Sequence, residues 1–326
     1  MRPLRILTWH VHGNYLWYLS HVPHELYLPV KPGRPEGYGG RGHTFPWPDN
    51  VHEVAAEDVP DLELDCVLTQ SHHNWLVDRE ELLSAAQLGL PAIHLEHDPP
   101  RQSPTDTLHP VDDPSVLLVH VTHFNDLMWD SGRTPTRVIE HGVVVPDGVR
   151  YSGEIERGVV VVNGLRRRGR RLGADVFERA RQHLPLDLVG MFSDELGGIG
   201  EVPPPELAAF VARYRFFFHP IRYTSLGLAA CEAMMLGMPI VALATTEMAT
   251  VVDNGVSGWV DTDVGRLIER MGELLGDRGE ARRLGEGARH TAVERFSIER
   301  FVGNWDRAFR FVCGRTEERV SAGARP

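Results

Sequence analysis

The chain has 326 residues, of which 42% are hydrophobic and 24% charged, a composition typical of a globular protein large enough for two domains. Its net charge of −11 disfavours non-specific binding to nucleic acid, which relies on a basic surface. No run of about 18 apolar residues exists, so a membrane span is excluded. Three widely spaced cysteines and an N-terminus without a signal-peptide pattern predict a cytoplasmic protein without disulfides.

The first half of the chain alternates apolar strands with helices and loops, a pattern that predicts a parallel α/β sheet. We expect strands at residues 5–11, 25–30, 65–70, 91–95, 116–122 and 138–143. Helices are expected at residues 15–20, 79–88 and 124–131. Residues 31–53 are rich in glycine and proline and are interpreted as one long loop. These elements predict an N-terminal Rossmann-like domain over residues 1–150.

Polar residues follow several of these strands, and ligands of open α/β sheets bind at such strand ends. The strand at 91–95 is followed by Glu96, His97 and Asp98, of which His97 is the first candidate for chemistry. The other candidates follow earlier strands and are His12, Gly13, Asn14, Ser71, His72, His73 and Asn74. No H-E-x-x-H pattern or fixed ligand spacing appears among the 17 histidines, so we expect no metal site.

The second half restarts after a turn-rich linker at residues 146–157. Strands are expected at residues 158–164, 186–190, 215–220 and 239–244, and helices at 205–214, 226–236, 264–275, 281–295 and from the N-cap Ser297 to Phe311. These elements predict a C-terminal Rossmann-like domain over residues 151–313 and a frayed tail over 314–326. The last helix has the option of crossing back to the first domain.

A basic turn follows the first strand of this second domain. Five arginines crowd the strand-to-helix junction, where α/β proteins bind phosphate: Arg166, Arg167, Arg168, Arg170 and Arg171. Like charges packed together are unfavourable unless anions lie near them. The turn is therefore either a phosphate clamp or an ordinary solvated basic patch.

The stretch from Arg222 to Asp261 is the most informative part of the sequence. Thr224 and Ser225 are good N-cap residues for a helix over residues 226–236, whose first amides would form an anion site. Gly237 is placed to end that helix in a left-handed conformation. Glu232 is a carboxylate among apolar helix residues and needs a polar partner such as the hydroxyls of a ribose.

This stretch resembles the C-terminal nucleotide-binding signature of the group 1 (family 4) retaining glycosyltransferases. The positions in register are Gly227, Glu232, Ala233, Gly237, Pro239, Glu247, Gly255 and Gly258. One position departs from the pattern, because Thr224 replaces the first glutamate of the family's Glu-x7-Glu pair. The resemblance implies the GT-B fold, in which two Rossmann-like domains face a cleft.

The resemblance also implies roles for individual residues. Glu232 would hold the ribose of a nucleotide sugar, and Arg166 with Arg171 would clamp its diphosphate, with Arg170 as an alternative clamp residue. The remaining donor-binding residues would be Gly13, Thr224, Ser225, Leu226, Gly227 and Leu228. His97 would lie beside the donor sugar as the catalytic candidate, with Glu96 and Asp98 as weaker ones. The acceptor would contact His12, Asn14, His72 and His73.

These roles add up to a retaining, metal-independent glycosyltransferase without a cofactor. Its partners would be a nucleotide-diphosphate sugar and a glycan, lipid-linked or small-molecule acceptor. A non-catalytic nucleotide-sugar-binding relative and a nucleotide-sugar epimerase of the same fold stay open as alternatives, and Thr224 is the main argument for the first of them. The donor base, the sugar, the acceptor and the oligomeric state are not indicated by the sequence.

Overall fold

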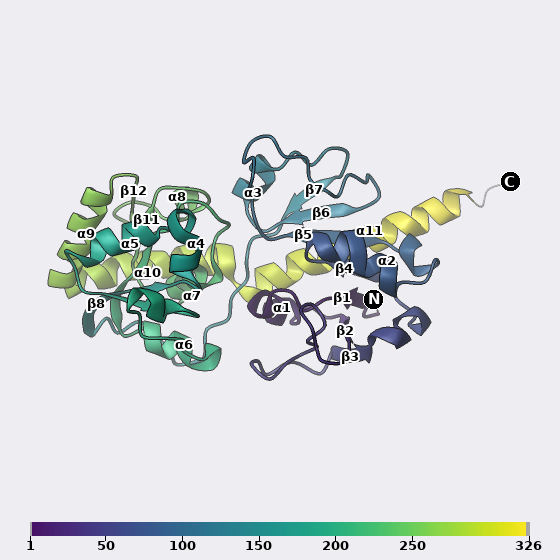
Figure 1. Ribbon diagram of the computed structural model, residues 1–326, viewed down its shortest axis with the longest axis horizontal. Coiled ribbons are helices and arrows are strands. Elements are labelled where there is room, and N and C mark those ends of the chain that lie inside the picture. Colours follow the sequence, from purple (N-terminus) through teal and green to yellow (C-terminus); the bar gives the residue numbers. More distant parts are fainter. Residues whose placement is uncertain (1, 324–326) are drawn as a thin grey trace. The chain divides into compact units, whose positions relative to one another are not determined.

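The computed structural model describes residues 2–323, with the side chains of residues 2–314. The chain divides into two compact units (Figure 1). The first unit comprises the residues up to Gly142 together with those from Ile298 onward, and the second comprises Val143–Ser297. None of the helices within residues 2–323 combines the length and the hydropathy that crossing a bilayer requires.

The first unit is built on a parallel sheet that, among the described residues, has seven strands in the order β3-β2-β1-β4-β5-β6-β7. The strands are β1 (Arg5–Thr8), β2 (Glu25–Val30), β3 (Val51–Ala55), β4 (Cys66–Thr69), β5 (Ala92–Glu96), β6 (Leu117–His120) and β7 (Thr136–Val138). Every residue of β4 and β6 is buried, as expected for strands covered on both faces. The order reverses between β1 and β4, so the loops after these two strands diverge and leave a crevice.

The helices of the first unit are α1 (Gly13–Leu19), α2 (Arg79–Leu82), α3 (His123–Met128) and α11 (Ile298–Gly323). Helix α11, yellow in Figure 1, contacts α1 and β5. Its Phe301, Trp305 and Phe309 are spaced four residues apart, form one stripe on the helix and are fully buried. Gly142 packs directly on the Phe301 ring, because a Cβ at Gly142 would lie 2.2 Å from Cβ of Phe301.

The place of α11 differs from the predicted division of the chain. The sequence pattern predicts residues 298–313 in the second domain, whereas in the structure they belong to the first unit, because the aromatic stripe of α11 is buried there. The C-terminal helix therefore crosses back to the first unit, which is one of the predicted possibilities. Residues 314–323, predicted to fray, continue α11, and residues 324–326 lie outside the described residues.

The second unit is built on a parallel sheet with five strands, among the described residues, in the order β12-β11-β10-β8-β9. The strands are β8 (Ile155–Val161), β9 (Leu186–Val189), β10 (Tyr214–His219), β11 (Ile240–Leu243) and β12 (Gly258–Asp261). The helices are α4 (Leu165–Leu172), α5 (Ala174–Arg181), α6 (Pro204–Val211), α7 (Leu228–Leu236), α8 (Met248–Val251), α9 (Val264–Gly276) and α10 (Arg278–Phe296). Helix α7 packs on α10, and α5 packs on α9.

Two predicted elements of the first unit are corrected by the structure. The helix expected at residues 79–88 ends at Leu82, because Gln87 bonds the backbone of Ser84 and donates to the carbonyls of Val59 and Leu62, which competes with helix formation. The loop expected over residues 31–53 ends in an unpredicted edge strand, β3. Glu53 of that strand pairs with Arg34 at 3.0 Å. This charged residue interrupts the apolar pattern that would have indicated a strand.

Candidate functional site

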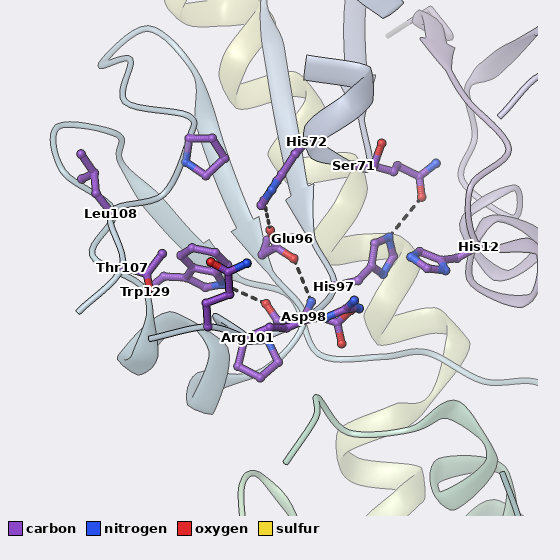
Figure 2. Close-up of a pocket in the computed structure, with 14 residues that line it drawn as sticks. His12, Ser71, His72, Glu96, His97, Asp98, Arg101, Thr107, Leu108 and Trp129 are labelled. Carbon is purple, nitrogen blue, oxygen red and sulfur yellow. Dashed lines mark hydrogen bonds and ion pairs between the residues drawn. The ribbon is translucent and has the colours of Figure 1, made fainter. Parts of the chain in front are cut away.

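A pocket of about 560 Å³ opens at the carboxyl ends of β1, β4 and β5, beside the point where the strand order reverses. His12 reaches it from the end of β1, residues 70–72 from the end of β4, and residues 96–98 from the end of β5. Trp129 closes one side, and its indole nitrogen donates to the Asp98 carbonyl at 2.8 Å. Figure 2 shows these side chains converging on one space. The fold therefore brings residues that are far apart in the sequence to the place where α/β sheets bind ligands.

His97 lies in a cage of rings at this pocket. Its ring centroid is 4.2 Å from that of His12, which lies beside it in Figure 2, and 4.8 Å from that of Tyr15. Its Nε2 lies 3.4 Å from Oε1 of Gln70. Burial, and then the positive charge that His12 can carry, lower the pKa of His97 well below its usual range. A neutral imidazole, able to donate or accept a hydrogen bond, therefore faces the pocket at neutral pH.

Glu96 is a buried carboxylate held from several sides. Its Oε2 lies 2.9 Å from Nε2 of His72, and its Oε1 accepts from the Asp98 amide at 2.8 Å (Figure 2). Its Oε2 also lies 3.2 Å from Nε2 of His109. Burial alone would raise the pKa of Glu96, but the bonds from His109 and His72 outweigh it and hold the pKa well below the usual range. The group is therefore an ionised carboxylate inside the unit.

The structure brings together some of the residues predicted for this site and leaves others out. His12, His72 and His97 line the pocket. Gly13 and Asn14 belong to the start of α1 and are not among its lining residues. His73 points to Asp78 instead, with its Nε2 3.6 Å from Oδ1 of that residue. None of the residues predicted for the site lies between Asp98 and β6. His109, from that segment, is nevertheless buried beside Glu96.

The second unit has its own switch point, between β8 and β10. There helix α4, which follows β8, meets the turn after β10, because the amides of Arg222 and Tyr223 both donate to the Arg171 carbonyl at 3.1 Å. Arg222 also binds Asp175 of α5 with both ends of its guanidinium, at 2.6 and 2.7 Å. The turn after β10 is thereby bonded to α4 and α5, in the place where an α/β unit binds phosphate.

The arginines predicted to form a basic turn lie on helix α4 in the structure, and they differ in their partners. Arg167 pairs with Glu195 at 2.6 Å and stacks on Phe192 at 3.4 Å, and Arg170 pairs with Asp175 at 2.6 Å. Much of the repulsion expected in this turn is therefore relieved by carboxylates. Arg166 donates to the Glu195 carbonyl at 2.8 Å, which leaves its charge unneutralised by that bond. Of the two alternatives for the clamp, Arg170 is already held by a carboxylate.

The start of α7 differs from its predicted form. The helix begins at Leu228 and its N-cap is Gly227, without a side-chain cap, so Ser225 does not cap it and Leu226 precedes it. The Ser225 hydroxyl is buried without a hydrogen-bond partner in the structure. Thr224 is half-buried, and so is Glu232, which was expected to be buried inside the helix. The end of α7 is as predicted, with Gly237 in the left-handed conformation at φ 91°.

His219 ends β10 beneath this turn. Its side chain is buried, neither ring nitrogen has a hydrogen-bond partner, and a Cβ at Gly227 would lie 3.9 Å from its Nε2. Burial lowers the pKa of His219 to about 4. The imidazole is therefore neutral wherever the second unit is folded at neutral pH.

Acid should destabilise the second unit through His219. Its pKa is lower in the folded state than in the unfolded state, so the unfolded state binds the extra proton between about pH 6.5 and pH 4, and stability falls as the pH drops through that window. We expect His219→Gln to remove about 2 kcal/mol of the loss between pH 7 and pH 5. Urea unfolding of wild type and variant at both pH values measures it, with His183→Gln, at an exposed histidine of the same unit, as the control. Equal pH dependence in all three proteins would contradict the assignment.

The match to a known protein family lies within the second unit. Residues 192–291 match the family model described as Glycosyl transferases group 1. A segment of 95 residues is 40% identical to an MMP alpha-(1->4)-mannosyltransferase of Mycolicibacterium hassiacum, covering 28% of this chain and 23% of that protein. The chain thus spans about a quarter of the length of this relative.

Solved structures resemble the whole chain. Sucrose-phosphate synthase from Thermosynechococcus elongatus has a TM-score of 0.70 at 16% identity, over 95% of this chain and 99% of that one. The Anabaena protein Alr3699/HepE, solved with UDP, has a TM-score of 0.65 at 13% identity, over 95% of this chain and 100% of that one. A glycosyltransferase from Rickettsia africae has a TM-score of 0.67 at 12% identity, over 96% and 99%. The chain therefore has the GT-B fold, and its residues 192–291 match the model of the group 1 glycosyl transferases.

Proposed function

We propose that the protein is a retaining glycosyltransferase that transfers a sugar from a nucleotide-diphosphate sugar to an acceptor, without a metal ion at the diphosphate. The observation that carries the proposal is the coincidence of two features in the second unit. The segment similar to the group 1 family contains Glu232 and the turn before α7. That turn is bonded to the arginine-rich helix α4 at the switch point of the sheet.

The donor would bind with its diphosphate between helix α4 and the turn before α7. Arg166 and Arg171 would face the phosphates, and the backbone around Gly227 at the start of α7 would contribute amides. The Ser225 hydroxyl, buried without a partner, supports the presence of a polar ligand at this turn. Glu232, half-buried on the same helix, would accept hydrogen bonds from the ribose hydroxyls.

Transfer would follow from where charge develops. As the bond to the sugar breaks, negative charge grows on the leaving diphosphate, and arginines with a helix N-terminus stabilise it without reorganisation. The acceptor would occupy the pocket of the first unit, where the neutral His97 can hydrogen-bond a sugar or acceptor hydroxyl. Retention would follow if the acceptor hydroxyl attacks from the side that the phosphate leaves, with that phosphate taking the proton.

The test is a panel of nucleotide sugars with release of nucleoside diphosphate as the readout. The panel should include UDP-glucose, which was bound in a solved structure of HepE, and mannose donors, because the curated relative is a mannosyltransferase. We expect Glu232→Gln to weaken nucleotide binding about tenfold or more, since the ribose loses a charged acceptor. Glu178→Gln, at an exposed glutamate on α5, should leave binding unchanged.

Three outcomes would count against the proposal in different ways. If no donor binds, or if Glu232→Gln binds as wild type does, the donor site is misassigned. Binding without turnover would instead favour a non-catalytic relative, and Thr224, in place of the family's first glutamate, would be the first residue to revert. A product with inverted anomeric configuration by NMR would contradict retention alone.

A further inference from the structure

A cluster of four side chains lies at the carboxyl end of the first sheet: His72 after β4, His94 and Glu96 on β5, and His109 before β6. One ligand atom from each lies within 4.8 Å of the other three. A zinc ion with bonds of about 2.0–2.1 Å holds its ligands about 3.4 Å apart, so small side-chain movements would bring these atoms to that spacing. A hydrogen-bonded network without an ion would also bring these atoms close together. The positions of the protons on the histidine ring nitrogens therefore distinguish a metal site from such a network.

His94 presents a bare lone pair to this cluster. Its Nδ1 lies 2.8 Å from Oγ1 of Thr69, and that hydroxyl donates to the Ile93 carbonyl at 3.5 Å. When the Thr69 hydroxyl directs its proton to that carbonyl, its oxygen accepts from Nδ1–H, which leaves Nε2 without a proton. The side chain is fully buried, and Nε2 has no hydrogen-bond partner in the structure. An orienting oxygen on one ring nitrogen and an unshared lone pair on the other is the arrangement of a metal-binding histidine.

His109 has the opposite arrangement. Its Nδ1 accepts from the Val111 amide at 3.0 Å, so the neutral ring carries its proton on Nε2 and donates it to Oε2 of Glu96 at 3.2 Å. His109 is thus suited to orient the carboxylate and not to bind an ion. The Asp98 amide holds the other carboxylate oxygen at 2.8 Å.

His72 can bind through Nε2. Its side chain is 44% exposed, so its Nδ1 can carry the proton towards solvent while Nε2, 2.9 Å from Oε2 of Glu96, gives up its own. The buried Nε2 of His94 has no hydrogen-bond partner in the structure, which is unfavourable in a buried site. A divalent cation bound there would give this atom a partner.

We propose that His72, His94 and Glu96 form a binding site for a divalent first-row transition metal of the zinc class. Two imidazoles and one carboxylate are ligands that such ions accept, and three protein ligands leave a further coordination position. His72 and Glu96 line the pocket, so that position is accessible from it. His109 positions Glu96, and the Trp129 ring packs 4.8 Å from the His109 ring and limits access of water. The site does not depend on the donor chemistry proposed for the second unit.

The experiment uses the full chain, without an affinity tag, after removal of metal with a chelator. Zinc is titrated in competition with a chromophoric chelator, and cobalt(II) is added separately so that its visible absorption reports the ligand geometry. We expect one zinc ion per chain, and a loss of about 100-fold or more in affinity for His94→Gln. His109→Gln should lose about tenfold, because it removes only the group that orients Glu96.

The matched control is His120→Gln, which removes an equally buried histidine from the neighbouring strand β6 that is not one of the three proposed ligands. It should bind zinc as wild type does. Circular dichroism and urea unfolding of each variant show whether it folds, and Glu96→Gln replaces His94→Gln if the latter does not. Absence of stoichiometric zinc binding by wild type, or equal binding by the His94, Glu96 and His120 variants, would overturn the proposal.

Discussion

Replacing Gly173 with alanine should destabilise the second unit by about 4 kcal/mol or more. Gly173 joins α4 to α5 with φ 82° and ψ 32°, a left-handed conformation that costs an alanine about 1–2 kcal/mol. A Cβ at this position would also lie 1.9 Å from the carbonyl oxygen of Pro220. That atom is backbone, so relief of the clash requires the turn after β10 to move away from the junction of α4 and α5.

Gly148→Ala is the matched control for this change. Gly148 lies in the same unit with φ 81°, and no atom lies within 4 Å of a Cβ built there. It should therefore show the conformational cost alone, about 1–2 kcal/mol. Urea unfolding gives the stabilities, and hydrogen exchange in peptides from residues 143–297 assigns the change to the second unit. If Gly173→Ala were no more destabilising than Gly148→Ala, the close approach to Pro220 would not exist in solution.

Trp305→Ala should cost the first unit about 3–5 kcal/mol. The indole is fully buried on α11, its ring centroid is 5.2 Å from that of Phe309, and its Nε1 donates to the Tyr15 hydroxyl at 3.1 Å. Truncation leaves a large cavity and removes a donor from a buried hydroxyl. The second unit should keep its stability, because α11 packs in the first.

Phe311→Ala on the same helix is the control, since its side chain is 43% exposed and lies over Arg137 at 5.0 Å. It should cost about 1 kcal/mol or less. Hydrogen exchange should then show loss of protection for Trp305→Ala in residues 2–142 and in α11, and none in residues 143–297. Loss of protection confined to α11 would mean that the helix is an appendage and not part of the core.

Much of the fold could be predicted because parallel strands buried on both faces have continuous apolar sequences. The runs around Val160 and Phe217 gave β8 and β10 in this way. The edge strand β3 was missed, because its one exposed residue, Glu53, is charged. The start of α7 was placed two residues early, because Ser225 has the residue type of an N-cap but Gly227 occupies the position.

The candidate site was predictable to the extent that its residues end neighbouring strands. His12, His72 and His97 follow β1, β4 and β5, so parallel pairing alone brings them to one edge. One signal for the cluster behind them was present as well, since His94 and Glu96 are two residues apart on a strand and must share a face. His109 could not be predicted, because it comes from an irregular segment. Such a segment has no periodic sequence pattern from which its course could be predicted.

The discontinuous first unit has a consequence for how the chain folds during synthesis. A ribosome releases residues in order, and domains generally fold as their residues emerge, the N-terminal one first. Here all of Val143–Ser297 emerges before α11, whose Phe301, Trp305 and Phe309 complete the core of the first unit. The first unit is therefore the first to be synthesised and the last to be completed. Until α11 emerges, the apolar residues of the first unit that pack against it stay exposed, while the second unit can already fold.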